Sequence, residues 1–134
     1  MISQTGRYAL RILGYLADHP GMWVQGREIA AATGIPANYL AKILNQLRKR
    51  GLVSSHKGWG GGFLLRERSL AVPIAEVLEL IDGPQNDQGC VFELRDCDAA
   101  RPCPLHERWA RVQAEFQDMI RSVSIGDLRS AGSN

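Results

Sequence analysis

The chain has 134 residues, enough for one domain, and 45% of them are apolar, an ordinary share for a protein with a real core. No run approaches the ~18 consecutive apolar residues that a membrane span needs, and the first residues, MISQTGRYAL, show no secretory signal. These features exclude a membrane protein and lead us to expect a cytoplasmic one.

The net charge of +2 hides an asymmetry. Residues 1–70 carry ten Lys/Arg against three acids, whereas residues 71–134 carry six Arg against eleven acids, so only the first half should attract a polyanion.

The basic half begins with three predicted helices. Residues 3–18 carry apolar side chains three to four positions apart, which predicts an amphipathic helix that stops before Pro20. A short helix is expected over about 26–33, and a longer one over 36–50 after a tight turn at Gly34. A short helix, a glycine-containing turn and a longer helix have the spacing of a helix-turn-helix.

The next segment predicts a β-hairpin. The run GLVSSHKGWGGGFLL, residues 51–65, places two strand-like stretches on either side of a glycine-rich turn, as in the wing of a winged helix. The third helix alone is equally explained by a solvated face whose C-terminal cations offset the helix dipole, but the wing favours nucleic acid. Duplex DNA is favoured over RNA because a protruding helix fits the DNA major groove, whereas A-form RNA hides its own. The predicted DNA-binding residues are Asn38, Tyr39, Lys42 and Arg48 on the helix and His56, Lys57, Trp59 and Gly60 on the wing.

The acidic half contains two further predicted helices and a loop. A helix over about 73–82 ends at Gly83, and residues 84–102 are polar and irregular. From Cys103 a long helix carries large apolar residues at spacings of three to four, namely Leu105, Trp109, Val112, Phe116, Met119, Ile120 and Val123. A domain this small can hardly cover such a helix, so we expect it to pack against its twin in a homodimer; the alternative is an ordinary core helix.

The predicted fold is therefore mainly α with a small β-hairpin wing. It consists of a winged helix-turn-helix DNA-binding domain over residues 1–72, a loop and long C-terminal dimerisation helix over 73–130, and a disordered tail at 131–134.

All three cysteines lie in one stretch, CVFELRDCDAARPCPLHERW, residues 90–109, together with one of the three histidines. Cys90 is followed after six residues by Cys97, after five more by Cys103, and after two more by His106. Three thiolates and an imidazole suit an iron–sulfur cluster or tetrahedral zinc, but the spacing matches neither ferredoxin nor zinc ribbon. A cluster, a zinc site and a redox-reactive thiol set all stay open. The sequence contains no Walker-type phosphate loop, nucleophile elbow or convincing carboxylate pair, so we do not expect an enzyme.

Several of these segments together resemble a known family. The runs TGRYALRILGYLA, IAAATGIPANYLAKILNQLRKRGLVSSHKGWGGGFLL and VPIAEVLELIDGP, the three cysteines and HERW are similar to the IscR/NsrR-type bacterial winged-helix iron–sulfur regulators, up to about Arg129. The resemblance implies a homodimer that binds near-palindromic DNA operators and carries an iron–sulfur cluster, controlling genes for cluster assembly, iron homeostasis or nitrosative stress.

The resemblance also implies a ligand set. Cys90, Cys97 and Cys103 match the family's three ligand cysteines, and His106 matches the histidine ligand of the cluster-assembly regulators. The nitric-oxide-sensing branch uses an aspartate near the N-terminus instead, where this chain has Arg7, which cannot ligate as a guanidinium. This favours His106 and a 2Fe–2S centre over a 4Fe–4S centre. The run KILNQL is closer to the nitric-oxide-sensing and iron-responsive branches, so the target genes stay open.

Overall fold

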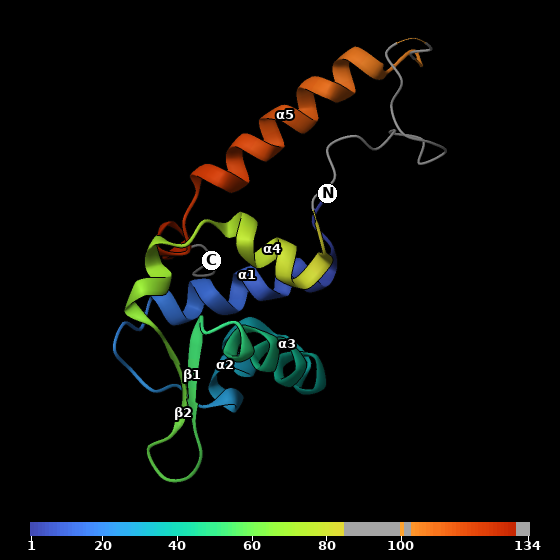
Figure 1. Ribbon diagram of the computed structural model, residues 1–134. Helices are drawn as coiled ribbons and strands as arrows, with labels where there is room; N and C mark the ends of the chain where they lie inside the picture. The colour runs from blue at the N-terminus through green and yellow to red at the C-terminus, as the bar shows by residue number, and fades with distance from the viewer. Residues whose placement is uncertain (85–99, 101–102, 131–134) are drawn as a thin grey trace.

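The computed structural model describes residues 1–84, 100 and 103–130. Its elements in chain order are α1 (Gln4–Ala17), α2 (Gly26–Thr33), α3 (Ala37–Lys49), β1 (Val53–His56), β2 (Gly62–Leu65), η1 (Glu67–Ala71), α4 (Ile74–Asp82), α5 (His106–Ser122) and η2 (Gly126–Leu128) (Figure 1). The strands of these residues form one antiparallel hairpin, β1–β2. The fold predicted from the sequence, mainly helical with a β-hairpin wing, is confirmed. In these ranges no helix has the length and apolar character needed to cross a membrane.

Local sequence sets the ends of the first three helices. The Ser3 hydroxyl accepts a hydrogen bond from the Gly6 amide at 2.8 Å and so caps the start of α1. α2 ends at Gly34, whose φ of 73° lies in the left-handed region that glycine adopts without strain. Pro36 immediately precedes α3, where its fixed φ suits the entry into a helix. The three helices expected over 3–18, 26–33 and 36–50 are thus confirmed to within a residue at each end.

The core is built around α1, which contacts α2, α3, α4 and β2. The buried side chains at the contact between α1 and α3 include Ile12, Leu13, Leu16, Leu40, Ile43, Leu44 and Leu47. Burying one such side chain stabilises the fold by about 1.5–3 kcal/mol, so this contact fixes which side of α3 faces inward. The opposite side of α3 is left to solvent.

Besides packing on α1 and α3, the hairpin is joined by a backbone bridge to the segment between α1 and α2. Val53 pairs with Leu65 at its base and His56 with Gly62 near its turn. Val24, between α1 and α2, exchanges two backbone hydrogen bonds with Phe63, at 2.8 and 2.7 Å. The wing is therefore tied to the segment that leads into the helix-turn-helix and does not hang from α3 alone.

α5 begins later than the sequence predicted. The apolar pattern placed Cys103 in its first turn, but the helix starts at His106 and Cys103 precedes it. Pro104 explains the difference, because a proline disfavours the helical conformation of the residue before it. The His106 amide donates to the Cys103 carbonyl at 3.0 Å, so a turn joins these two residues. They stay close together, but they do not share a helix face.

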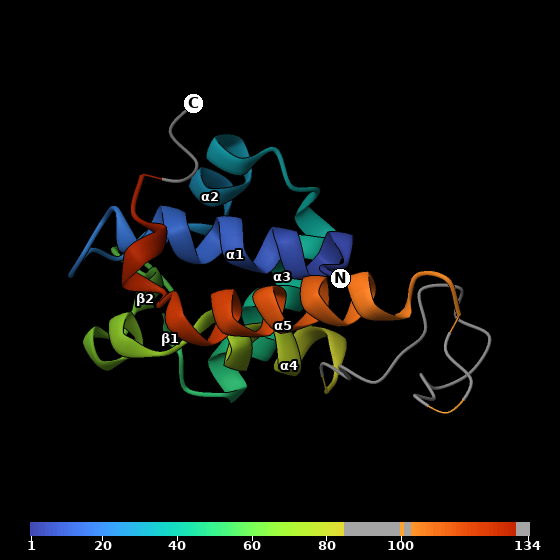
Figure 2. The ribbon, with the colours of Figure 1, turned by 90° about the horizontal axis from the view of Figure 1, so that it is seen from above.

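After α5 the chain returns to the core. Figures 1 and 2 show α5 lying over α4 and extending away from the other helices towards its N-terminal end. Beyond its C-terminal end the Ile74 amide donates to Val123, and the Ile125 amide donates to Val72, both at 2.9 Å. Ile125 is fully buried, and η2 contacts α1. The C-terminal end of α5 is thus anchored on the core.

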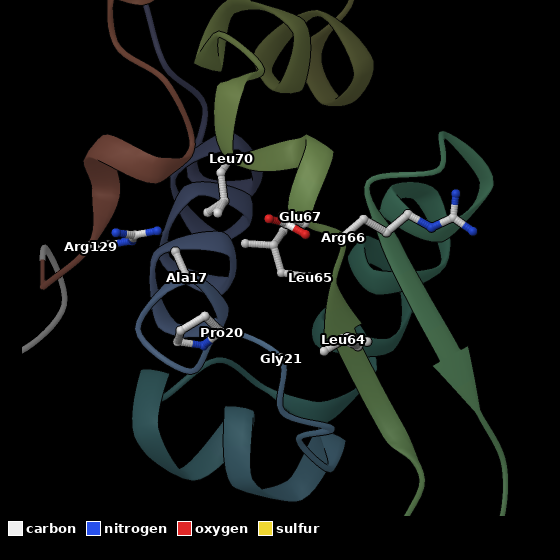
Figure 3. Close-up of a pocket in the computed structure, with 9 residues that line it drawn as sticks. All are labelled: Ala17, Pro20, Gly21, Leu64, Leu65, Arg66, Glu67, Leu70 and Arg129. Atoms are coloured by element: carbon white, nitrogen blue, oxygen red, sulfur yellow. The ribbon is translucent and has the colours of Figure 1, made fainter.

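A pocket of about 470 Å³ lies at the base of the hairpin, between the end of α1, β2 and η1 (Figure 3). Leu65 and Leu70 contribute apolar surface to it, and Glu67 and Arg129 are charged residues among its lining. Arg66 extends away from it, and its Nε donates to the Ser54 hydroxyl at 3.1 Å. Because the pocket lies at the opposite end of the hairpin from the turn, it is separate from the surface that the turn and α3 present.

Candidate functional site

α3 presents its polar side to solvent. All four of its predicted DNA-binding residues are exposed: Asn38, Tyr39, Lys42 and Arg48. The guanidinium of Arg48 donates to the side-chain oxygen of Asn45 at 2.8 Å, which extends the row of polar groups by a residue from the same helix. The exposed side of α3 therefore offers donors and acceptors along most of its length.

An aromatic cluster holds the start of α3 against α1. The rings of Tyr39 and Tyr8 meet edge to face with centroids 6.3 Å apart. The guanidinium of Arg11 lies 5.8 Å from the centroid of Tyr8 and donates a hydrogen bond to the carbonyl of Thr33, the last residue of α2. Sequence reasoning missed Tyr8 and Arg11. Their spacing of three on α1 places them on one side of that helix, but nothing local indicates that this side meets α3.

The wing residues predicted to bind DNA are also exposed. His56 and Lys57 lead into the turn, and Trp59 and Gly60 lie within it. The ring of His56 lies 5.9 Å from that of Trp23, which precedes the strand-like residue Val24. Trp23 was not predicted, because the contact depends on how the chain after α1 runs beside the hairpin.

α3 and the wing enclose a shallow hollow of about 370 Å³. From α3 it is lined by Ala41, Asn45 and Arg48, and from the wing by Ser55, His56, Lys57, Gly62 and Phe63. Residues from the two elements therefore share one concave surface. Ser55 also lines this hollow. Sequence reasoning missed it, because its neighbours there come from a different element.

This surface is positively charged. No acid occurs between Glu28 and Glu67, and the exposed cations on this surface are Lys42, Arg48, Lys49 and Lys57. A surface with cations and no compensating carboxylates attracts a polyanion and repels a positively charged protein. The α3–wing surface, defined as the exposed residues of α3 and residues 55–61, therefore has the chemistry of a nucleic-acid interface.

Two of the four predicted metal ligands lie in the described residues. Cys103 is a half-buried free thiol, and His106 is half-buried at the first position of α5. Cys90 and Cys97 lie outside the described residues. Among residues 1–84, 100 and 103–130, no three metal-ligating side chains come together. The four-residue ligand set thus stays a prediction.

Comparisons with a family model and with individual relatives agree on the protein family. Residues 2–131 match the Rrf2 family, described as an iron-dependent transcriptional regulator. A protein of Aquifex aeolicus named as an HTH-type transcriptional regulator is 35% identical, over 96% of this chain and 90% of its own. The HTH-type transcriptional regulator IscR of Vibrio cholerae is 30% identical, over 95% of this chain and 73% of its own.

Solved structures agree with this result. The global cysteine regulator CymR of B. subtilis superposes with a TM-score of 0.78 at 29% identity, covering 98% of this chain and 97% of its own. T. potens IscR, at 22% identity, shares the fold with a TM-score of 0.71 over 96% of this chain and 85% of its own. With its winged-helix fold and a family match over nearly its whole length, the chain belongs to the Rrf2 family of transcriptional regulators.

Proposed function

We propose that this regulator is a homodimer that binds near-palindromic operators in duplex DNA, and that an iron–sulfur cluster held by Cys90, Cys97, Cys103 and His106 controls this binding. The observation that carries the DNA part is the α3–wing surface, where exposed cations and polar groups from two elements meet without a single acid. The cluster part rests on the donor set and on the likeness to IscR-named regulators.

In the proposed complex α3 enters the major groove. Asn38 and Lys42 lie one turn apart on its exposed side, and asparagine can pair with an adenine edge through two hydrogen bonds. Asn38→Ala should weaken binding to the preferred duplex by about 1–3 kcal/mol per subunit and relax the preference at one base position in each half-site. To test this, wild type and variant are each used to select duplexes from a randomised library, and the selected sequences are compared. Unchanged preference at every position would show that Asn38 reads no base.

α5 supports the homodimer. Its large apolar residues recur at the alternating spacing of a coiled-coil seam, Leu105, Trp109, Val112, Phe116, Met119 and Val123, and three of them are at least 40% exposed. Its own chain buries Gln113, Gln117 and Ile120, and Phe116 and Val123 of the stripe pack partly against the same core cluster. The open part of the stripe is Leu105, Val112 and Met119. Large apolar residues on the open side of a helix call for a partner surface. A second copy offers the same stripe, as an isologous dimer requires.

The donor set fits an iron–sulfur cluster, since thiolates and imidazole are the ligands that such clusters take. Cys103 and His106 are half-buried at the N-terminal end of α5, and within this helix the buried residues begin only at Gln113. A bound cluster would supply sensitivity to oxidants, nitric oxide or iron supply. The helices would carry the effect to DNA, because α5 packs on α4, and α4 packs on both α1 and α3.

Anaerobic purification with iron, acid-labile sulfide and zinc quantified tests the cluster. We expect a brown protein with about two irons and two sulfides per subunit, and a DNA affinity that changes when the iron is removed. His106→Ala should alter the visible spectrum, whereas His19→Ala, which removes another half-buried imidazole, should leave it unchanged. A colourless protein without iron, or identical spectra for His106→Ala and the parent protein, would overturn the assignment.

A thiol-based or zinc-based regulator without a cluster is the second candidate. The likeness to CymR, named as the global cysteine regulator of B. subtilis, favours it at 29% identity. The half-buried free thiol of Cys103 would then be one of the responding groups. In this case metal-free protein should change its DNA affinity on thiol oxidation and recover with a reductant, and Cys103→Ser should abolish that response. A response that follows iron content alone excludes it.

A further inference from the structure

Trp59 stands out on the wing, because none of the residues that the structure describes covers it. Its exposed fraction is 102%, against 41% for Trp23, and no other large apolar side chain of the described residues is as open. Indole rings are usually largely buried in folded proteins and are enriched where a surface binds a partner. An open ring contributes little to the fold itself, so its position calls for an external contact.

The turn that carries Trp59 is closed by contacts that glycine permits. The Gly61 amide donates to the Gly58 carbonyl at 3.1 Å. A Cβ atom at Gly61 would lie 2.2 Å from the His56 carbonyl oxygen, and Gly58 and Gly60 have φ values of 96° and 71°. A side chain at Gly61 would therefore push the turn apart. The backbone presents the indole ring from a tight, well-defined loop.

The same glycines make the tip thin. From residue 57 to residue 62 the sequence is KGWGGG, so Lys57 and Trp59 supply all the side chains. The minor groove of B-DNA is about 6 Å wide, which excludes a hairpin with side chains at each position but admits a nearly bare backbone. Since no acid lies between residues 29 and 66, the tip favours a polyanion over an ordinary protein partner.

We propose that Trp59 is a wedge, whose indole enters the minor groove of the operator and inserts between two adjacent base pairs. The inference rests on the proposed DNA binding. Apolar side chains of minor-groove proteins insert in this way and kink the duplex. Pyrimidine–purine steps unstack most easily, so the protein should prefer such a step under each wing without a hydrogen bond to a base edge. Stacking by Trp59 also differs from a phosphate contact by Lys57 in its salt dependence, because an uncharged ring releases no counterions from the DNA.

The test compares wild type, Trp59→Ala, Trp59→Phe and the matched control Trp23→Phe. The probe is a duplex of about 30 base pairs, long enough for two half-sites, which the wild type selects from a randomised library. Copies with 2-aminopurine at successive steps report unstacking by a rise in emission. Affinity is measured by fluorescence anisotropy at several salt concentrations.

Trp59→Ala should weaken binding by about 5- to 150-fold per subunit, the range of one lost aromatic–base stack, and by more for the dimer, which loses one stack in each half-site; the salt slope should stay unchanged. Trp59→Phe should fall between it and wild type, and Trp23→Phe should match wild type. The wild type should raise 2-aminopurine emission at one step in each half-site, and Trp59→Ala should not.

Three results would overturn the wedge while leaving the proposed function intact. They are unchanged affinity in Trp59→Ala, weaker binding of Trp59→Ala without any 2-aminopurine signal in the wild type, or a salt slope of Trp59→Ala that falls as expected for a lost phosphate contact. The second would place the ring on the sugar–phosphate backbone, and the third would mean that the loop had changed shape. If the wild type selects no duplex at all, the proposed function fails and the wedge fails with it.

Discussion

Gly62 is where the wing meets the rest of the domain, and Gly62→Ala should damage both stability and DNA binding. Its φ is 130°, which L side chains rarely adopt. An added Cβ would lie 2.4 Å from the carbonyl oxygen of Val24 and 2.6 Å from the carbonyl carbon. Both atoms belong to backbone and cannot rotate away, so β2 and the Val24 segment must separate.

The cost follows from these contacts. The backbone conformation itself costs about 1–2 kcal/mol for a residue with a Cβ. Separation also breaks the two hydrogen bonds between Val24 and Phe63, at 2.8 and 2.7 Å, each of which contributes about 0.5–1.5 kcal/mol. Together these give about 2–5 kcal/mol, a large share of the 5–15 kcal/mol that stabilises a typical domain.

Urea unfolding followed by circular dichroism measures this change, at one fixed protein concentration because dimerisation adds to apparent stability. Gly60→Ala is the matched control. Its φ is 71°, also left-handed, but no atom lies within 4 Å of the added Cβ, so it should lose only the conformational part, about 1–2 kcal/mol. A Gly62→Ala variant that loses no more than Gly60→Ala would refute the reasoning, since the Val24 contact would then carry no strain.

Three further outcomes are expected. Val112→Asp on the open side of α5 should give a monomer by analytical ultracentrifugation, whereas Ala114→Asp, with the same charge on the opposite side, should stay dimeric; dimers from both would refute the seam. Lys57→Ala should lower the slope of log affinity against log salt by about one unit per subunit, hence about two units for the dimer, on all duplexes, and an unchanged slope would remove Lys57 from the interface. Hydrogen bonds with the backbone and, to a lesser extent, the side chain of Ser124 lower the pKa of Asp127 in the folded protein. The Asp127 carboxylate therefore stabilises the fold at pH values above its pKa in the unfolded chain, and this stabilisation is lost as the pH falls through its pKa in the folded protein. The difference in unfolding midpoint between wild type and Asp127→Asn should therefore shrink in acid, and a difference that grows in acid would contradict this.

The sequence was informative where a single helix or turn decides the outcome. The buried stripe of α3 follows from apolar spacing alone, and Gly34 and Pro36 mark its start through their own backbone preferences. The hairpin followed from two strand-like runs around glycines. The predicted start of α5 was wrong, because the apolar spacing continues through Leu105 and so suggested a helix from Cys103. Pro104 restricts the backbone of the residue before it, and apolar spacing does not reveal this restriction.

Contacts between elements were beyond the sequence. The bridge between Val24 and Phe63 is isolated, so it produces no repeating pattern in the sequence. The sequence therefore assigned Gly62 to the turn alone. Ser55 lies in the hollow beside α3, and Tyr8 meets Tyr39, only because the core sets the angles between the helices. The predicted DNA-binding residues lie on one surface for the same reason, while the complete cysteine set extends outside the described residues.

The two ends of α5 are held very differently, and this bears on how a ligand could control DNA binding. The C-terminal end is fixed by the hydrogen bonds to Ile74 and Val72 and by buried Ile125, whereas Cys103 and His106 lie at the other end, where the described residues of α5 include no buried side chain before Gln113. A weakly held segment can be ordered by a ligand, and the binding free energy then stabilises the ordered arrangement. Because α4 lies between α5 and both α1 and α3, a shift of α5 must change the packing that orients α3. Two such chains joined along α5 would convert that change into a different distance between their α3 helices, and a palindromic operator is sensitive to that distance.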